Sequence, residues 1–224
     1  MQTYSKKLHK IKHNDNDYID FIYDDLKRLS EIKIHFGDTF SLEKYSYNDQ
    51  NQMIKREYGK NYEDIYSYEN GLLKSSESIN KINDRWHRKN VFIYDNNRIT
   101  KANVYFNEIL TGYILYKYDL NGNTIERKEY SYGKTEPDVP VSHYKFYYDD
   151  KKNPVFSLNV FPVDLVQKNN PVYTYYYLVT MSMFPPEYES EFTYDNDGFP
   201  VQELRHFKNW PSDAQPEKYT YIYE

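Results

Sequence analysis

A short aromatic pattern recurs along almost the whole chain and constrains the fold more than any other feature. Each copy is an aromatic residue, any residue and a tyrosine, followed by an acidic residue or asparagine. The copies are Phe21-Ile22-Tyr23-Asp24, Tyr45-Ser46-Tyr47-Asn48, Tyr66-Ser67-Tyr68-Glu69, Phe92-Ile93-Tyr94-Asp95, Tyr116-Lys117-Tyr118-Asp119, Phe146-Tyr147-Tyr148-Asp149, Phe192-Thr193-Tyr194-Asp195 and Tyr221-Ile222-Tyr223-Glu224. About one copy would arise by chance at this composition, so the eight copies indicate an internal repeat.

The pattern predicts a β-hairpin at each copy. Residues i and i+2 of a strand share one face, so the aromatic residue and the tyrosine place two rings side by side. Turn formers such as Asn70-Gly71 and Asn121-Gly122 come next, and they tolerate the positive φ that tight hairpin turns require. An alternating segment then follows, as at residues 28–34. Each copy thus supplies a strand, a tight turn and a second strand.

The spacing of the repeated tyrosines is regular except at one place. Successive tyrosines lie 24, 21, 26, 24, 30, 46 and 29 residues apart. The value of 46 is about twice the others, which predicts a degenerate copy between Tyr148 and Tyr194. We expect its turn at residues 168–171, because Asn169 and Asn170 tolerate the left-handed conformation and a proline follows them.

Together the hairpins predict one all-β domain spanning residues 1–224, with residues 1–16 as a flexible start. The expected topology is an up-and-down antiparallel meander of about 14–16 strands. A sheet this wide must curl, close or be covered, and no segment between the hairpins is predicted to form a covering helix. We therefore expect a strongly coiled or barrel-like single sheet.

Alternate connections of a meander lie at opposite ends of the sheet. The tight turns after the repeated tyrosines should therefore share one end, and the return connections should share the other. The return connections at residues 132–140 and 208–216 are long and contain prolines, so we expect long loops at that end. Residues 172–184 are apolar or aromatic on both faces, which predicts a strand buried on both sides.

The composition supports a folded protein with a tyrosine-rich core. The chain has 28 tyrosines and 19% aromatic residues, whereas disordered chains are poor in aromatics. Tyrosine buries a large ring and keeps a polar tip, which explains a mean hydropathy of -0.97. The net charge is -5, and the charged residues are interspersed without a long basic segment. Nucleic-acid binding usually needs a basic stripe, so we predict no nucleic-acid partner. No apolar stretch is long enough for a membrane helix, so we predict no transmembrane segment.

Residues that could carry chemistry each have a structural explanation. The chain has no cysteine, which excludes disulfides, cysteine-ligated metals and a cysteine nucleophile. The six histidines lack the spacing of a helical zinc site, and acids in segments such as Asp195-Asn196-Asp197-Gly198 suit tight turns without an ion. We therefore predict no metal, no cofactor and no enzyme activity. A hydrolase remains an alternative, since two of the many carboxylates could meet in a cleft.

Both tryptophans, Trp86 and Trp210, fall in return connections and therefore at the same end of the predicted sheet. Loops held by a rigid scaffold are where binding usually resides, and a tryptophan beside Pro211 in a polar loop suits stacking on a sugar or peptide. We therefore predict that both tryptophans bind a ligand. The alternative is that each tryptophan caps the open end of the core, because tryptophan is highly buried on average.

Two groups of proteins share these patterns. The aromatic-x-Tyr-Asp-x-x-Gly spacing at residues 116–125 and 192–201 resembles the YD repeats of RHS-type proteins. The even run of hairpins and the terminal Tyr219-Thr220-Tyr221-Ile222-Tyr223-Glu224 resemble an uncharacterised family of Bacteroidetes surface lipoprotein domains with a porin-like fold. This second resemblance covers the chain from Tyr18 to Glu224. It implies export and attachment through a lipidated cysteine upstream, and it supplies no catalytic residues.

A repeat scaffold with many aromatics and no reactive motif favours a non-catalytic binding module at the cell surface or in the periplasm. Its partner would be a glycan, a peptide or a protein. The alternative is a structural or secretion-related shell segment, like the shells that YD repeats form. Residues 1–7 lack the apolar core of a signal peptide, so we expect the exported location if an upstream signal was removed and a cytoplasmic location otherwise.

Overall fold

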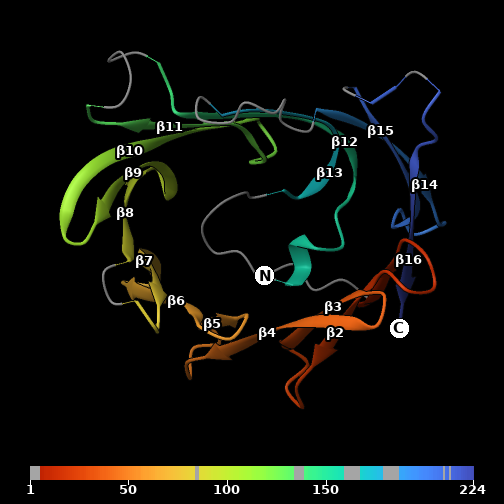
Figure 1. Cartoon of the computed structure of the whole chain (residues 1–224), viewed down its shortest axis with the longest axis horizontal. Helices are drawn as coiled ribbons and strands as arrows, with labels where there is room; N and C mark the ends of the chain where they lie inside the picture. Colours follow the sequence, from red (N-terminus) through yellow and green to blue (C-terminus); the bar gives the residue numbers. More distant parts are fainter. Residues whose placement is uncertain are drawn as a thin grey trace.

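The computed structural model describes residues 6–83, 86–133, 139–158, 167–178, 187–208, 210–211 and 213–224. These residues form antiparallel strands and one short 3-10 turn (Figure 1). The strands are β1 (Leu8–Lys12), β2 (Tyr18–Tyr23), β3 (Leu29–Phe36), β4 (Thr39–Tyr47), β5 (Met53–Tyr58), β6 (Tyr62–Glu69), β7 (Leu72–Asn80), β8 (His87–Asp95), β9 (Arg98–Phe106), β10 (Ile109–Tyr118), β11 (Thr124–Ser131), β12 (Ser142–Lys152), β13 (Asn169–Leu178), β14 (Tyr188–Tyr194), β15 (Pro200–Phe207) and β16 (Glu217–Tyr223). The turn is η1 (Phe156–Leu158).

Each strand pairs with the next along the chain, and β1 also pairs with β16, which closes the sheet into a barrel. At the closure Ile11 lies opposite Tyr221, and Lys12 lies opposite Thr220. The structure thus confirms the all-β meander and shows that the sheet closes. The flexible start predicted for residues 1–16 is wrong for Leu8–Lys12, because this segment is the strand that completes the barrel wall.

The two ends of the barrel differ. We call the end that carries the tight turns after the repeated tyrosines the turn end, and the opposite end the return end. The prediction that return connections are long is wrong at several places. The β3–β4 turn contains Gly37, which has a positive φ, and Asp38. The β9–β10 turn contains Asn107 and Glu108, which both have a positive φ. Such two-residue turns match the twist of paired strands.

A β-bulge recurs in the hairpins, next to the repeated tyrosine. In the β2–β3 hairpin the register shifts between Ile22 and Tyr23. Phe21 lies opposite Ile32 and Tyr23 opposite Leu29, so Ile32 and Leu29 share the inner face although they are three residues apart. The same shift occurs in the β4–β5, β6–β7, β8–β9, β10–β11 and β14–β15 hairpins. A bulge bends its strand and increases its twist, which helps the sheet to curl.

The tyrosine of each repeat ties its hairpin to the preceding one. Between β9 and β10, for example, the backbone ladder ends with Lys101 opposite Leu115, well before Tyr118. Beyond that pair the two strands separate, and the Tyr118 side chain crosses the gap so that its hydroxyl donates to the carbonyl oxygen of Ile99 at 2.8 Å. We call this bond a tyrosine clamp. Equivalent clamps of 2.6–2.8 Å join Tyr23 to Leu8, Tyr47 to Leu29, Tyr68 to Met53, Tyr94 to Leu73, Tyr148 to Thr124 and Tyr223 to Pro200.

Removing one clamp should lower stability measurably. We expect Tyr118→Phe to reduce the free energy of unfolding by about 1–1.5 kcal/mol, since it leaves the Ile99 carbonyl without its phenol donor. Tyr147→Phe is the matched control, because the Tyr147 side chain points outward and is 59% exposed. Urea unfolding of both variants measures the difference. Equal stability of the two variants would show that the clamp contributes nothing.

The rings of the repeat form the core at the turn end. Phe21, Tyr45, Tyr66, Phe92 and Tyr116 are each 7% exposed or less and belong to one hydrophobic cluster. The first residues of β1, β3 and β5 complete this cluster; they are Leu8, Leu29 and Met53, each 1% exposed. The side-by-side rings predicted from the sequence therefore face the barrel interior.

Residues 153–158, which follow β12, fold into the barrel. Figure 1 shows η1 inside the ring of strands, and Leu158 belongs to the core cluster while Val155 packs against it. The predicted turn at residues 168–171 is wrong, because Asn169 and Asn170 lie in β13. The 46-residue spacing arises from the long connection between β12 and β13 and not from a hidden repeat.

The strand predicted to be buried on both sides has one exposed face. β13 ends at Leu178, and residues 179–184 of the predicted strand lie outside the described residues. Tyr177 is 41% exposed, and Tyr173 contacts the exposed Tyr147 edge to face. A run of tyrosines is compatible with water because each ring keeps a polar tip, so the aromatic pattern alone overstated burial.

The outer wall of the barrel carries ion pairs. At β10–β12, Glu126 accepts from Lys117 at 2.9 Å, Lys128 at 3.1 Å and His143 at 2.8 Å. Burial alone would raise the pKa of Glu126, but the hydrogen bonds from these three side chains outweigh it and lower the pKa to about 2. No helix among the described residues is long and apolar enough to cross a membrane.

Candidate functional site

One repeat position departs from the apolar core pattern. It lies opposite the first ring of the motif, and Ile32 and Ala102 fill it in two of the repeats. Arg56, Arg127 and Glu203 fill it in three others. Because an aliphatic side chain serves in the same place elsewhere in the barrel, the fold does not require these charges. Desolvating a charge costs stability, so inward-facing charges mark a candidate site.

The first charged group lies on β4–β7. The Arg56 guanidinium contacts Glu43 at 2.7 Å and Asp64 at 3.5 Å. The Tyr45 hydroxyl donates to Glu43, and the Ser78 hydroxyl donates to Asp64 at 2.6 Å. Burial would lower the pKa of Arg56, but the hydrogen bond and charge of Glu43 raise it, so the guanidinium remains protonated.

A chain of rings links Arg56 to Trp86. Arg56 lies over the ring of Tyr58, with 4.7 Å to its centroid, and Tyr58 stacks on Tyr62 at 5.6 Å. Trp86 contacts Tyr62 edge to face at 6.3 Å and Phe106 at 6.5 Å. We call Arg56, Tyr58, Tyr62, Trp86 and Phe106 the Trp86 cluster. It runs from the rim of the return end toward the barrel interior.

A second cluster contains Trp210. Arg205 lies between two rings, 4.7 Å from the centroid of Tyr188 and 4.5 Å from that of Tyr219. Tyr188 contacts Phe207 at 5.6 Å, and Phe207 stacks on Trp210 at 4.5 Å. Trp210 itself is 46% exposed. We call these five residues the Trp210 cluster.

Glu203 anchors the Trp210 cluster from the interior. Its side chain is 3% exposed and accepts hydrogen bonds from Ser190 at 2.6 Å and from Tyr221 at 2.8 Å. It also contacts the Arg205 guanidinium at 2.9 Å. Burial would lower the pKa of Arg205, but the charge of Glu203 raises it. Burial, together with Glu203, also raises the pKa of Tyr221 well above its usual value.

A third charged group lies between the two clusters. Glu129 accepts from Arg88 at 3.0 Å and from Arg127 at 3.2 Å, so Arg88 reaches across β9 and β10. On the neighbouring strands Tyr144 and Tyr176 stack at 4.1 Å.

Buried hydroxyls accompany this third group. Ser142 lies directly opposite Glu129, and Thr174 lies on β13 opposite Phe146. Ser142 is 5% exposed and Thr174 is 7% exposed. Neither hydroxyl oxygen has a hydrogen-bond partner among the described residues. The interior wall at β11–β13 thus combines charges, stacked rings and unused hydrogen-bonding capacity.

The exposure of the inner wall differs between the two ends. Inward-facing Arg56, Arg88 and Arg205 keep 22%, 32% and 27% of their side-chain area exposed. Inward-facing Leu8 and Leu29 at the turn end keep 1%. Water therefore reaches the inner wall from its middle, at Arg56, to the rim of the return end, while the turn end is packed.

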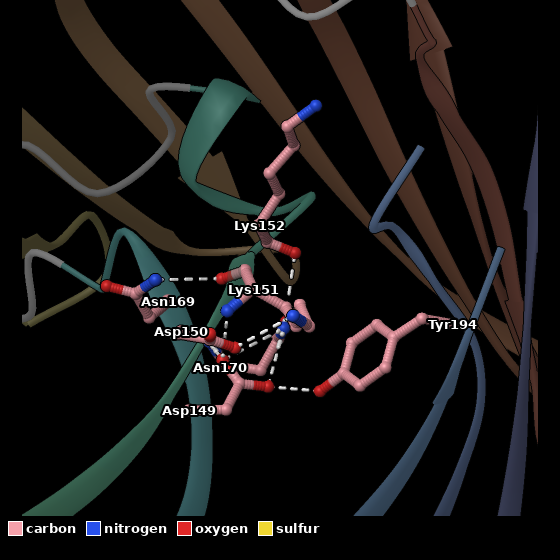
Figure 2. Close-up of polar contacts among 7 residues, drawn as sticks. All are labelled: Asp149, Asp150, Lys151, Lys152, Asn169, Asn170 and Tyr194. Carbon is pink, nitrogen blue, oxygen red and sulfur yellow. Dashed lines mark hydrogen bonds and ion pairs between the residues drawn. The ribbon is translucent and has the colours of Figure 1, made fainter. Parts of the chain in front are cut away.

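At one seam a carboxylate replaces the usual carbonyl of the tyrosine clamp. Tyr194 of β14 donates to Asp149 of β12, as Figure 2 shows. Asp149 also accepts from the Asn170 backbone N–H at 3.0 Å and from the Asn170 side-chain amide at 3.2 Å. The β13–β14 ladder pairs Tyr173 with Glu189 and Thr174 with Tyr188, the shortest ladder among the described residues. Asp149 therefore joins three strands where backbone pairing is weakest.

The two predicted site residues, Trp86 and Trp210, both lie at the return end, as their positions in return connections imply. They lie between β7 and β8 and between β15 and β16, on opposite sides of the closed ring (Figure 1). They therefore belong to separate clusters and do not form one flat platform. Their binding role stays a prediction.

The sequence reasoning did not identify the inward-facing charged residues. These are Glu43, Arg56, Asp64, Arg88, Arg127, Glu129, Glu203 and Arg205. Aligning the second strands of the repeats could have found three of them, since a charge stands where other copies have Ile32, Ala102, Ser76 or Thr174. Within the described parts of the chain, no group of three or more His, Asp or Glu side chains is arranged to hold a metal ion.

No protein-family model matches the chain, and no curated protein matches its sequence. Among solved structures, a porin-like protein from Bacteroides uniformis matches with a TM-score of 0.60 and 10% identity, over 100% of this chain and 99% of that chain. The Tc holotoxin pore of Photorhabdus luminescens gives a TM-score of 0.37 and 10% identity, over 93% of this chain and 13% of that chain. The second value is too low to indicate a shared fold. The first similarity shows that this chain has the fold of the porin-like protein, and at this identity it extends to the fold alone.

Proposed function

We propose that the barrel is a non-catalytic binding module that takes a glycan or a peptide at its return end. The observation that carries the proposal is the replacement of aliphatic core residues by Arg56, Arg127 and Glu203 at one repeat position. Around these charges lie the Trp86 and Trp210 clusters, which supply aromatic faces at a water-accessible rim. Binding sites commonly combine aromatic surface with a few placed polar groups.

A purely structural shell is the second candidate. A shell needs only an inner wall that packs, and Ile32 and Ala102 show how this repeat packs without charge. Replacing buried ion pairs by apolar residues is often neutral or stabilising, so charges at equivalent positions favour a binding role over a shell. The packed turn end fits the shell description, and the polar return end does not.

A hydrolase is less well supported. Two carboxyl groups about 5–10 Å apart must share acid and base or nucleophile roles in such enzymes. Glu43, Glu129 and Glu203 each accept hydrogen bonds from arginine, so their oxygens are engaged as acceptors. The general acid would have to come from another group.

The location we propose is the cell surface or the periplasm. The resemblance to YD repeats and to Bacteroidetes surface lipoprotein domains supports export. The composition of the outer wall favours contact with water. A lipid-facing barrel wall is apolar at alternate positions. This wall instead carries ion pairs such as Lys10–Asp20 and Lys89–Glu77.

Substituting the tryptophans tests the binding proposal. We expect Trp210→Ala and Trp86→Ala each to weaken binding at least about tenfold, because aromatic anchors carry much of the affinity of such sites. Trp210→Ala should lower stability by less than about 1.5 kcal/mol, as its side chain is half-exposed. Ligands found by screening glycan and peptide arrays with the wild-type barrel supply the binding assay.

Tyr147→Ala is the matched control for the tryptophan variants. Tyr147 is an exposed aromatic residue on the outer wall, away from both tryptophan clusters. Its replacement should leave the affinity unchanged. Unchanged binding in both tryptophan variants, or a loss of several kcal/mol of stability in Trp210→Ala, would make the tryptophans structural and refute the proposed site.

A further inference from the structure

We infer that the ligand of the return end is a neutral oligosaccharide, an inference that rests on the proposed binding function. The charges of the inner wall give the first reason. Arg56 is paired with Glu43, Arg88 with Glu129, and Arg205 with Glu203. A charged ligand would have to compete with these existing pairs.

A neutral polyol can use the same pairs without breaking them. A guanidinium has five N–H donors, so a sugar hydroxyl can accept from an arginine that stays paired with its carboxylate. Among the carboxylates, Glu129 is 19% exposed and accepts from Arg88 and Arg127, which leaves lone pairs for a sugar hydroxyl. Sugar hydroxyls both donate and accept, and they can therefore bridge an arginine and its carboxylate. The partial exposure of Arg56, Arg88 and Arg205 leaves these groups within reach of solvent, and so of a ligand.

The hydroxyls on β12 and β13 are a separate observation that points to a ligand. Ser142 and Thr174 are buried, and their oxygens have no hydrogen-bond partner among the described residues. An unsatisfied buried polar group is unfavourable, and a ligand hydroxyl would satisfy it. Ser142 faces the interior beside Glu129, and Thr174 precedes Tyr176 on the same face of β13. Stacked Tyr144 and Tyr176 offer an aromatic surface next to these hydroxyls.

The closed wall disfavours a peptide ligand. Extended peptides bind by adding a strand to a free sheet edge, and helical peptides bind in apolar grooves. A closed barrel offers no free edge to its interior, because every strand has two neighbours. The inner wall at the return end carries charged side chains among its aromatic rings, so it is not an apolar groove. A sugar needs neither an edge nor an apolar groove, only ring faces and hydrogen-bonding groups.

Calorimetric titration of the full chain with three classes of probe tests the inference. The neutral probes are cellohexaose, maltohexaose and xylohexaose, the anionic probe is hexagalacturonic acid, and the peptides are those found by array screening. We expect a neutral hexasaccharide to bind with an affinity that changes less than about twofold between 0.05 M and 0.5 M salt, since screening acts on charged ligands. Binding of hexagalacturonic acid or a peptide alone would overturn the inference and leave the binding function standing. Absence of binding by every probe would overturn both.

Ser142→Ala separates a ligand contact from a structural role. We expect it to weaken neutral hexasaccharide binding about tenfold while leaving the unfolding midpoint unchanged or higher, because it removes an unsatisfied hydroxyl from the barrel wall. Ser46→Ala, at an exposed serine of β4, is the matched control and should change neither quantity. Unchanged affinity in Ser142→Ala, or a fall in the unfolding midpoint, would overturn the assignment of Ser142 to the sugar.

Discussion

Glu203→Ala is expected to lower the free energy of unfolding by about 3–5 kcal/mol, the usual cost of removing one partner of a buried ion pair. Glu203 is 3% exposed and accepts from Ser190, Tyr221 and Arg205. Its removal leaves the Arg205 guanidinium between two tyrosine rings without its carboxylate, and it leaves two hydroxyl donors unsatisfied. Urea unfolding followed by circular dichroism measures the loss.

Two further variants are compared with Glu203→Ala. Glu189→Ala is the control, since Glu189 lies in the same hairpin with 51% of its side chain exposed and should change stability by less than about 0.5 kcal/mol. The double variant Glu203→Leu with Arg205→Met replaces the pair by apolar groups and should recover most of the stability. It should also lose ligand binding. A double variant as unstable as Glu203→Ala would mean that the fold requires the charges.

Asp149→Ala should cost about 3 kcal/mol, because four donors lose this acceptor and an unsatisfied buried group costs about 1–3 kcal/mol. The donors are the Tyr194 hydroxyl, the backbone and side-chain N–H groups of Asn170, which is 2% exposed, and the backbone N–H of Lys151. Burial and the hydrogen bond to Asp149 raise the pKa of Tyr194, which therefore remains a phenol donor. The loss should concentrate at the β13–β14 seam, where hydrogen exchange of the backbone amides will accelerate first.

The neighbouring residue is the control for this seam. Asp150 is 84% exposed and pairs with Lys151 (Figure 2), so Asp150→Ala should leave both stability and exchange near the wild-type values. Asp149→Asn keeps one oxygen acceptor and should fall between the two. Uniform acceleration of exchange around the whole barrel in Asp149→Ala would contradict a local role at the seam.

The hairpin repeat was predictable because its signal is local. The paired rings and the turn residues of each copy lie within a few residues of one another, and their spacing specifies strand, turn and strand. Seven of the eight copies begin a hairpin, and the last copy lies in β16, which pairs with β1. Closure was not predictable, since it depends on the curvature summed over all strands and on pairing between Leu8–Lys12 and the last strand. The long spacing before Tyr194 led to the wrong prediction of a degenerate repeat, because an inserted connection lengthens the spacing in the same way.

The inward-facing charges were hidden by the β-bulge. Counting alternate residues from buried Met53 places Lys55 and Glu57 inside and Arg56 outside. The bulge reverses this assignment, so Arg56 lies opposite buried Tyr45 while Lys55 and Glu57 pair on the outer wall. The same reversal turns Arg127 inward. In the β2–β3 hairpin, the apolar character of Ile32 indicates that it faces inward, although counting alternate residues from Leu29 places it outside. A charged residue at the same position gives no such indication.

The candidate site exists only in a closed barrel, because an open sheet has no interior for these charges to face. Lys12 and Thr220 are register partners at the closure, and both alternate with inward-facing neighbours, so they lie on the outer wall. Paired residues of adjacent antiparallel strands have Cα atoms about 4.5–5.5 Å apart, within the range that a disulfide spans. The chain has no cysteine of its own, so an engineered pair reports on this contact alone.

The measurement is therefore the fraction of intramolecular disulfide in the double variant Lys12→Cys with Thr220→Cys after mild oxidation, with each single variant as control. The closed barrel predicts nearly complete intramolecular cross-linking and a raised unfolding midpoint, since the bond would join strands at opposite ends of the chain. An open sheet would hold the two edges far apart, up to about 70 Å at the usual strand spacing. The double variant would then form only intermolecular dimers, and that result would contradict the closed barrel and the binding site within it.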